Sequence, residues 1–323
     1  MTSLIRRREF IRLSGAAAVG ASFAGAVGAT TSATAAYAAD AASLIPAAGA
    51  HFGAYVYENG VVGPEPLEAK IGRTLAINHC FQLTDHPFPL QRFQQDIAAG
   101  RIPMLSWAAG EQPELAKILT GVYDEKIVTQ AQQMKSLGVP MFLRFTWEFD
   151  MRYKDTGLFK DVWRYVHWKF ISVNASNVAF VFCPTWRAYR ETYTADEYYP
   201  GDSHVDWIAA DGYARPHETA KYHYRPFKLM FDSAHTFSLR YGKPLMVGET
   251  GVHRDPANPV QAAWLNATRG DIKRYFPNLK AFNYFHRDGN EGTNNWRVTV
   301  PNGGPAQVAF TNFANDPYFK PSS

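Results

Sequence analysis

Residues 139–150 read V-P-M-F-L-R-F-T-W-E-F-D, and this stretch decides the fold. It begins as an apolar run suited to a strand buried on both faces, as parallel strands are, and it ends abruptly in ionisable side chains. A second stretch of the same form, residues 243–251 (K-P-L-M-V-G-E-T-G), places Glu249 where the first has Glu148. Two buried strands that each end in a glutamate predict paired carboxylates on one rim of a parallel barrel.

Further segments have the length and composition of strands, and helical spacing separates most of them. In chain order, the strand candidates are residues 51–57, 74–81, 102–107, 139–148, 177–183, 205–213, 243–249 and 279–286. The predicted helices are residues 64–72, 90–100, 114–138, 158–173, 227–241 and 259–276. This alternation favours a single-domain α/β fold, the (β/α)8 TIM barrel, over an open doubly wound sheet, and no G-x-G-x-x-G follows a strand to indicate a nucleotide.

The N-terminus has the pattern of an export signal. Three arginines at residues 6–8 precede Phe10 and Ile11, and an Ala/Gly-rich uncharged tract ends in an A-x-A pattern at residues 36–38. This arrangement resembles the twin-arginine signal, and the tract is too weakly apolar for a stable membrane span. We therefore expect residues 1–39 to be a twin-arginine-type signal peptide, with a basic disordered tail as the alternative. Residues 40–323 would then form a secreted catalytic domain with no membrane attachment.

Charge and composition narrow the function classes. The net charge is +4, but four arginines and one glutamate lie in the first 12 residues, so the remainder is near neutral and offers nothing to attract nucleic acid. The histidines are scattered without ligand spacing, and Cys80 and Cys183 lie in apolar strands. We expect no metal or other cofactor, two buried free thiols rather than a disulfide, and a monomer. Aromatic residues make up 15% of the chain, which suits a site that stacks on sugar rings.

Polar and aromatic residues at strand ends carry the most information, because a parallel barrel has its active site at the carboxyl ends of its strands. Taken singly, each has a structural explanation: such a glutamate is most often solvated, a lone histidine is most often a satisfied core residue, and a tryptophan packs. Acid/base chemistry on a glycosidic bond, however, needs two facing carboxyl groups and aromatic platforms. Glu148 and Glu249 supply the pair, and neither a G-x-S-x-G nor an H-E-x-x-H motif points elsewhere.

A succession of motifs over roughly residues 52–286 resembles glycoside hydrolase family 26. The motifs are R-F-T-W-E-F-D at 144–150, W-R-Y-V at 163–166, N-V-A-F-V-F-C-P at 177–184, Y-P-G-D at 199–202, V-D-W at 205–207, D-G-Y at 211–213 and G-E-T-G at 248–251. This is the β-mannanase family of the barrel clan whose catalytic glutamates end strands four and seven.

The resemblance implies a retaining mechanism with Glu148 as general acid/base and Glu249 as nucleophile. It also implies that Arg144 holds the catalytic carboxylates and that Tyr213 hydrogen-bonds the nucleophile. From their places near strand ends, the other predicted substrate-binding residues are Asn78, His79, Trp107, Trp147, Trp186, Asp211, Phe285 and His286. We expect the aromatic ones to line an open groove for a β-linked polysaccharide rather than a pocket for a small disaccharide.

The sequence departs from the family pattern beside the bond to be cleaved. Trp147 stands where the family has His, Asp150-Met151 replaces Asn-Gly, and residues 152–155 (R-Y-K-D) replace an aromatic run. These departures bear on the substrate more than on the fold. Endo-β-1,4-mannanase-like cleavage is the leading prediction, and xylan, mixed-linkage glucan or a bacterial exopolysaccharide are alternative substrates. A catalytically inactive carbohydrate-binding barrel is a further alternative, against which the intact pair of glutamates argues.

Overall fold

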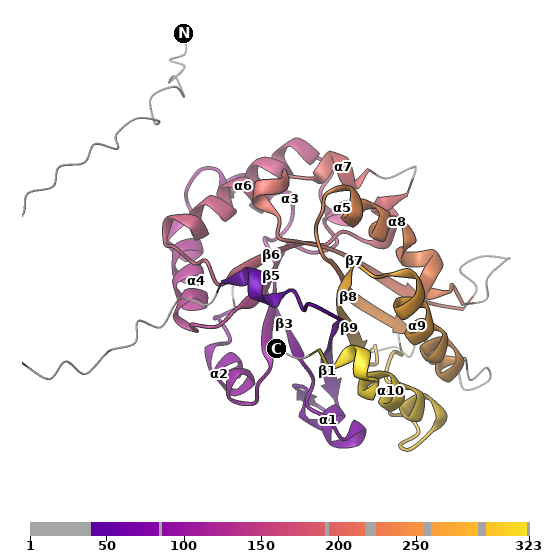
Figure 1. Ribbon diagram of the computed structural model, residues 1–323. Coiled ribbons are helices and arrows are strands. Elements are labelled where there is room, and N and C mark those ends of the chain that lie inside the picture. The colour runs from indigo at the N-terminus through magenta and orange to yellow at the C-terminus, as the bar shows by residue number, and fades with distance from the viewer. Residues whose placement is uncertain are drawn as a thin grey trace, which may run out of the picture. The chain divides into compact units, whose positions relative to one another are not determined.

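The computed structural model describes residues 40–83, 86–190, 194–216, 224–254, 260–289 and 295–321. In these residues, parallel strands form a closed barrel surrounded by helices (Figure 1), which confirms the predicted (β/α)8 TIM barrel. The barrel strands are β1 (His51–Glu58), β3 (Ile77–Gln82), β4 (Ile102–Trp107), β5 (Met141–Phe145), β6 (Val178–Phe182), β7 (Trp207–Ala214), β8 (Leu245–Val252) and β9 (Leu279–His286). The barrel closes where β1 pairs in parallel with β9, and the short β2 (Val61–Val62) pairs antiparallel with the end of β1.

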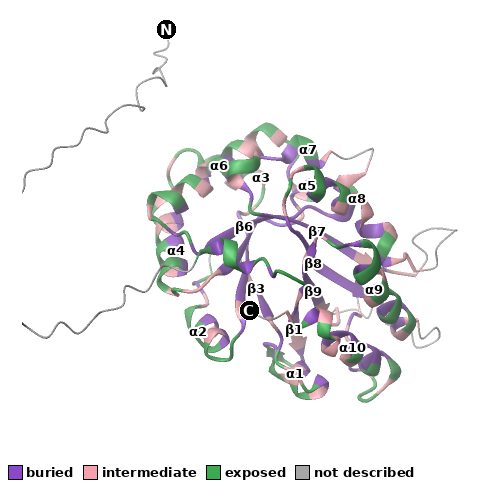
Figure 2. Ribbon diagram, viewed as in Figure 1, coloured by how far each residue is buried: buried purple, intermediate pink, exposed green. Residues whose placement is uncertain are grey.

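The helices cover the outside of the barrel and bury only their inner faces (Figure 2). They are α1 (Glu65–Ile71), α2 (Leu90–Ala98), α3 (Gln112–Ile118), α4 (Asp124–Ser136), α5 (Phe149–Arg152), α6 (Thr156–Ser172), α7 (Ala195–Tyr198), α8 (Phe227–Arg240), α9 (Gln261–Tyr275) and α10 (Pro305–Asn315). The 3-10 helices are η1 (Ala41–Leu44), η2 (Trp186–Tyr189), η3 (Asp202–His204) and η4 (Pro317–Phe319). None of the helices in the described ranges is long and apolar enough to cross a bilayer.

Helix α6 illustrates how the apolar spacing produces this layer. Its buried residues recur at intervals of three and four, so they form one stripe that faces the strands. Within that stripe, the Trp163 ring lies 5.9 Å from the ring of Phe145 on β5 and 6.0 Å from that of Phe180 on β6. The helix begins at Thr156, and the side chain of the preceding Asp155 caps it by accepting a hydrogen bond from the Leu158 backbone N–H.

One predicted helix is divided in the structure, and a helix after the last strand was not predicted. The single helix expected over residues 114–138 is two helices, α3 and α4, because the chain turns at Gly121 with a φ of 82°. This left-handed conformation favours glycine and cannot continue a right-handed helix. Helix α10, which follows the last strand, was not predicted.

The barrel interior has an apolar lower half at the amino ends of the strands. Alternate residues of each strand point inward, and here they are Ile77, Met104, Phe142, Ala179, Val181, Trp207, Ala209, Met246 and Ala281. Ala41 and Leu44 of η1 pack against the same cluster. η1 therefore closes the amino end of the barrel with apolar side chains.

Both cysteines are free and buried, as predicted. Cys80 packs in the outer cluster between strands and helices, whereas Cys183 packs inside the barrel. The two thiols therefore lie on opposite sides of the barrel wall, which explains why no disulfide joins them.

Candidate active site

Glu148 and Glu249 line one pocket of about 290 Å³ at the carboxyl ends of the barrel strands. The other lining residues are Tyr213, Arg215, Phe285, Arg287, Gly289 and Trp296. The structure thus brings together four of the predicted site residues, namely the two glutamates, Tyr213 and Phe285.

The backbone that carries Glu148 leaves the strand before the glutamate is reached. β5 ends at Phe145, and the Glu148 N–H donates instead to the Cys183 carbonyl at 2.9 Å. Thr146 and Glu148 both have positive φ, 45° and 49°, a conformation that is uncommon for residues other than glycine. The sequence analysis predicted that Glu148 ends a strand. In the structure, Glu148 belongs instead to a tight turn between β5 and α5.

Side chains on either side hold this turn in place. Asp150, buried just after Glu148, accepts hydrogen bonds from the Thr185 N–H at 2.8 Å and from the Thr185 hydroxyl at 2.6 Å. The Thr146 hydroxyl lies 2.7 Å from the hydroxyl of Tyr153. Turns held in sparsely populated conformations cluster at functional sites, and here the effect is to direct the Glu148 side chain into the pocket.

Glu249 is held by two donors. Its carboxylate forms an ion pair with Arg144, and it accepts a hydrogen bond from the Tyr213 hydroxyl at 2.5 Å. The residue before it must be glycine, since a Cβ on Gly248 would come within 2.6 Å of Asp211 Oδ1 and of Cys183 Sγ. The G-E pair of residues 248–249 therefore lets the strand pass over a buried ionic cluster and still present the carboxylate to the pocket.

Arg144 is the centre of that cluster. It is fully buried, its Nη1 donates to the two Asp211 oxygens at 2.6 and 2.7 Å, and its Nε donates to the Ser106 hydroxyl at 2.7 Å. Burial alone would lower the pKa of Arg144, but Asp211 and Glu249 raise it well above its ordinary value. The guanidinium is thus a permanent positive charge beneath Glu249.

His79 supports Arg144 through Ser106. Its Nε2 lies 2.6 Å from the Ser106 hydroxyl, which also accepts the hydrogen bond from Arg144. Burial, and secondly Arg144, lower the pKa of His79 well below its ordinary value, so the ring is neutral. His79 and Asp211, both predicted to bind substrate, therefore lie beneath the pocket and orient the groups that line it.

The environment of Glu148 differs from that of Glu249. No hydrogen bond or ion pair joins its carboxyl group to another residue in the described part of the chain. Burial, and secondly the charge of Glu249, raise the pKa of Glu148 to about 7, although Arg144 and Arg152 act in the opposite direction. One carboxyl group can therefore carry a proton near neutral pH while its neighbour is paired with a cation, which is the division that acid/base chemistry needs.

Four predicted substrate-binding residues lie outside the pocket, because they point away from the barrel interior. The Asn78 side chain donates to Asp96 on α2 at 2.7 Å, and the Trp107 ring packs 5.8 Å from Phe145 on the helix side of the wall. His286 lies fully buried, with its Nε2 3.5 Å from the Glu58 carboxylate. The fourth is Trp186, and these predictions are corrected.

Trp186 packs over β7 on its helix-facing side. Its ring lies where a Cβ on Gly212 would meet it at 3.0 Å, and Phe231 of α8 lies at the same point. The guanidinium groups of Arg187, Arg190 and Arg225 lie 5.3, 5.1 and 4.7 Å from its ring. Trp186 thus fills a junction between strand and helix.

Trp147 lies beside the pocket but presents little free surface to it. Its ring packs edge-on against Phe81 at 5.0 Å, and the guanidinium groups of Arg144 and Arg152 lie 5.5 and 4.7 Å from it. The tryptophan that replaces the family histidine therefore places two cations close to Glu148.

Four pocket residues were missed by the sequence analysis, namely Arg215, Arg287, Gly289 and Trp296. Arg215 and Arg287 are the first residues after β7 and β9. Their place just beyond a strand end was a signal that the sequence contained. Trp296 lies beyond β9 in a stretch without periodic spacing, and its ring packs 4.7 Å from that of Tyr213.

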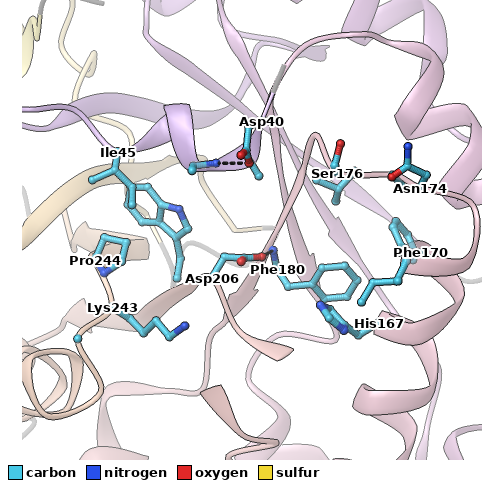
Figure 3. A pocket seen from close by; sticks show the side chains of 17 residues that line it. Asp40, Ile45, His167, Phe170, Asn174, Ser176, Phe180, Asp206, Lys243 and Pro244 are labelled. Atoms are coloured by element: carbon cyan, nitrogen blue, oxygen red, sulfur yellow. Dashed lines mark hydrogen bonds between the residues drawn. The ribbon is translucent and has the colours of Figure 1, made fainter. Parts of the chain in front are cut away.

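A larger pocket of about 440 Å³ lies at the opposite end of the barrel, where residues of η1 meet Asp206, Lys243 and Pro244 (Figure 3). Within this pocket, the Asp206 carboxylate accepts a hydrogen bond from the Phe180 N–H at 2.7 Å. Because the active sites of these barrels lie at the carboxyl ends of the strands, this pocket is not the catalytic site.

The sequence and the fold both match known glycoside hydrolases. Residues 108–240 match the model of glycosyl hydrolase family 26. The fold resembles a family 26 β-mannanase from Bacteroides ovatus, with a TM-score of 0.66, 16% identity, and coverage of 84% of this chain and 90% of that one. It also resembles the catalytic domain of a family 26 endo-β-1,4-mannanase from Bacillus sp. JAMB-750, with a TM-score of 0.65, 16% identity, and coverage of 85% and 88%.

A double mutant of the Cellulomonas fimi endo-β-1,4-mannanase has a TM-score of 0.64 at 16% identity, and the match covers 84% of this chain and 71% of that one. No curated protein matches the sequence. At these identities the structural likenesses establish the fold, and the family assignment comes from residues 108–240, which contain Glu148, Arg144 and Tyr213. The resemblance inferred from the motifs is confirmed over this segment, which matches the model of glycosyl hydrolase family 26.

Proposed function

We propose that this glycoside hydrolase is a secreted retaining enzyme that cleaves internal β linkages of a polysaccharide, with an endo-β-1,4-mannanase-like activity. The observation that carries the proposal is the unequal pair in one pocket: Glu249 paired with Arg144 and hydrogen-bonded by Tyr213, and Glu148 with its pKa raised to about 7. A retaining glycosidase needs one carboxylate as nucleophile and one carboxylic acid as proton donor.

In the first step, Glu249 attacks the anomeric carbon and forms a glycosyl-enzyme while Glu148 protonates the departing glycosidic oxygen. In the second step, Glu148 takes a proton from water, which attacks the anomeric carbon and releases Glu249. Arg144 and Tyr213 orient the carboxylate of Glu249 in both steps. We expect the two carboxyl groups to lie about 5–5.5 Å apart, the separation that a covalent intermediate requires, and a crystal structure of the enzyme would measure it.

The substrate class rests on the known structures. The Bacteroides ovatus and Bacillus structures that the fold resembles are described as mannanases, and β-mannan is therefore the first substrate to test. Secretion rests on the arginine-containing N-terminus of residues 1–39, and intact-mass measurement of the protein recovered from culture medium would test the cleavage.

The deciding experiment is a screen of residues 40–323 against mannan, xylan, mixed-linkage glucan and an exopolysaccharide. New reducing ends on mannan, with a rapid fall in viscosity, are the expected result for internal cleavage. Nuclear magnetic resonance of the first product should show the β anomer. An initial α anomer would contradict the retaining mechanism, and no product from any polysaccharide would favour a carbohydrate-binding barrel without activity.

A further inference from the structure

The pocket that holds the two glutamates is also lined by two arginines, Arg215 and Arg287. Resting on the function proposed above, we propose that these arginines select a polysaccharide that carries carboxylate groups, such as a β-glycan containing uronic acid residues. The inference goes beyond the mannan of the structural relatives, since mannan is neutral.

Of the two arginines, Arg287 provides the stronger evidence for this proposal. Its guanidinium lies 5.2 Å from the Tyr57 ring. Among the ion pairs between described residues, none involves Arg287. Two other arginines near the same end of the barrel are different, since Arg254 pairs with Asp288 at 3.0 Å and Arg297 pairs with Glu58 at 2.5 Å. Those two cations hold the fold, whereas Arg287 borders the pocket with its charge uncompensated by a described carboxylate.

Arg215 borders the same pocket and covers its aromatic surface. Its guanidinium lies 5.3 Å from the Tyr213 ring and 5.0 Å from the Trp296 ring. Neutral sugars are held mainly by stacking on exposed aromatic faces. Here a cation lies over the rings that a sugar would otherwise use, which favours recognition by charge over recognition by stacking.

The charges around the pocket favour the binding of an anion. Of its two carboxyl groups, Glu249 is paired with the buried Arg144, and Glu148 carries a proton for much of the time near neutral pH because its pKa is raised to about 7. Arg152, which lies against Trp147, adds a further cation beside Glu148. Among the described residues, a carboxylate on the substrate would therefore meet Arg287 in the pocket lining and Arg152 beside Glu148.

A carboxylate suits arginine better than other anions do, because the planar guanidinium can donate two parallel hydrogen bonds to it. A sulfate ester would meet the same charge without this fit. Charge-assisted hydrogen bonds of this kind raise affinity by roughly tenfold or more each.

The test compares a neutral polysaccharide with its charged counterpart. β-Mannan and the same mannan partially oxidised at C6 to carboxylates share their linkages and differ only in charge, and a sulfated mannan provides a second anion. At low ionic strength, the expected kcat/KM on the oxidised mannan is roughly tenfold or more above that on the parent, with the sulfated form in between. Added salt should reduce this ratio, because it screens exposed charges.

Variants locate the effect. Arg287→Gln should reduce the ratio of oxidised to neutral mannan by roughly tenfold, and Arg215→Gln should reduce it as well. The matched control is Arg274→Gln, because Arg274 also lies over an aromatic ring, 5.2 Å from Tyr275, but on the exposed end of α9. This control should leave the ratio unchanged. Thermal unfolding of each variant separates a change in preference from a loss of fold.

Binding to Glu148→Gln, measured by calorimetry, keeps this inference separate from the proposed function. If this protein binds oxidised mannan oligosaccharides more tightly than neutral ones while wild type cleaves neither, the proposed function fails and the charge selection stands. Equal or stronger binding of the neutral form, no binding of either form, or a ratio that Arg287→Gln does not change would overturn the inference.

Discussion

The two halves of the barrel interior are built from the same strands but differ in the side chains that they bury. In the lower half, the inward residues are apolar, and the Phe142 ring packs edge-on against Trp207 at 5.0 Å. Two residues further along β5, the inward side chain is Arg144, which pairs with Asp211 and Glu249. A single strand thus contributes to an apolar core at one end and to a buried ionic cluster at the other.

The difference teaches where stability and chemistry reside. Burying Phe142 removes apolar surface from water, which stabilises the fold. Burying Arg144 costs solvation free energy that its partners offset only in part, and buried ion pairs are weak evidence for stability. The lower half therefore holds the barrel together, and the upper half uses that rigidity to position charges.

Glu249→Ala should produce the largest effect. No covalent intermediate can form without the nucleophile, so we expect turnover to fall by on the order of 10⁴- to 10⁶-fold on every substrate, however good its leaving group. Steady-state kinetics with both polysaccharide and an activated aryl glycoside would measure it. Azide should rescue this variant only by direct displacement, with a product of inverted configuration.

Glu148→Ala should have a smaller and substrate-dependent effect. Loss of general acid/base catalysis should lower polysaccharide cleavage by about 10²- to 10⁴-fold. An activated aryl glycoside does not need the proton, so the glycosyl-enzyme should still form quickly and give a burst before a slow steady state. Azide should speed that slow step and yield a product of retained configuration.

These two variants can also overturn the assignment. If azide gave a product of retained configuration with Glu249→Ala and a product of inverted configuration with Glu148→Ala, the two roles would need to be reassigned. If both variants kept the activity of the wild type, the upper half of the barrel would not be a catalytic site.

Phe142→Ala tests the lower half. Truncating a fully buried phenylalanine should lower the free energy of unfolding by about 3–5 kcal/mol, through lost burial and the cavity that remains. Denaturant titration would measure this loss. Below the unfolding transition, we expect kcat to match that of the wild type. A large fall in kcat for well-folded Phe142→Ala would show that the two halves of the barrel are not separable.

The smallest expected effect is a shift in the pH profile. Glu148 must be protonated for the first step, so kcat/KM should fall as the pH rises through about 7, the value to which burial and Glu249 raise its pKa. Arg152 lowers that pKa, and Arg152→Gln should therefore move the alkaline limb to higher pH. A limb that stayed in place, or moved to lower pH, would contradict the assignment of this limb to Glu148.

The corrected site residues show where reading the sequence was insufficient. Asn78 and His79 were both predicted to bind substrate, yet adjacent strand residues point to opposite faces, and only His79 points inward. The same alternation separates Phe285, which lines the pocket, from His286, which does not. The alternation of inward and outward residues along a strand could have been applied to the sequence. It would have excluded one residue of each adjacent pair from the predicted site.

The fold itself followed closely from local pattern. Apolar runs with β-branched and aromatic residues predicted the barrel strands, and three-four spacing predicted most of the helices. The glutamate in each of the two stretches that decide the fold was likewise visible, because a charged residue after a buried run is conspicuous. The split of residues 114–138 into α3 and α4 was missed because a glycine inside a helical pattern can either continue or break it.

The sequence by itself determined the barrel, the pair of glutamates and their place at the carboxyl ends of the strands, since these depend on residue type and spacing along one segment. Only the tertiary structure decided that Arg144 joins Asp211 and Glu249, and that Arg215, Arg287 and Trp296 border one pocket. These residues come from β5, β7, β8 and the segments after β7 and β9, and closure of the barrel brings them together. Local periodicity carries no information on such contacts, because they depend on strand register and on loops that have no repeat.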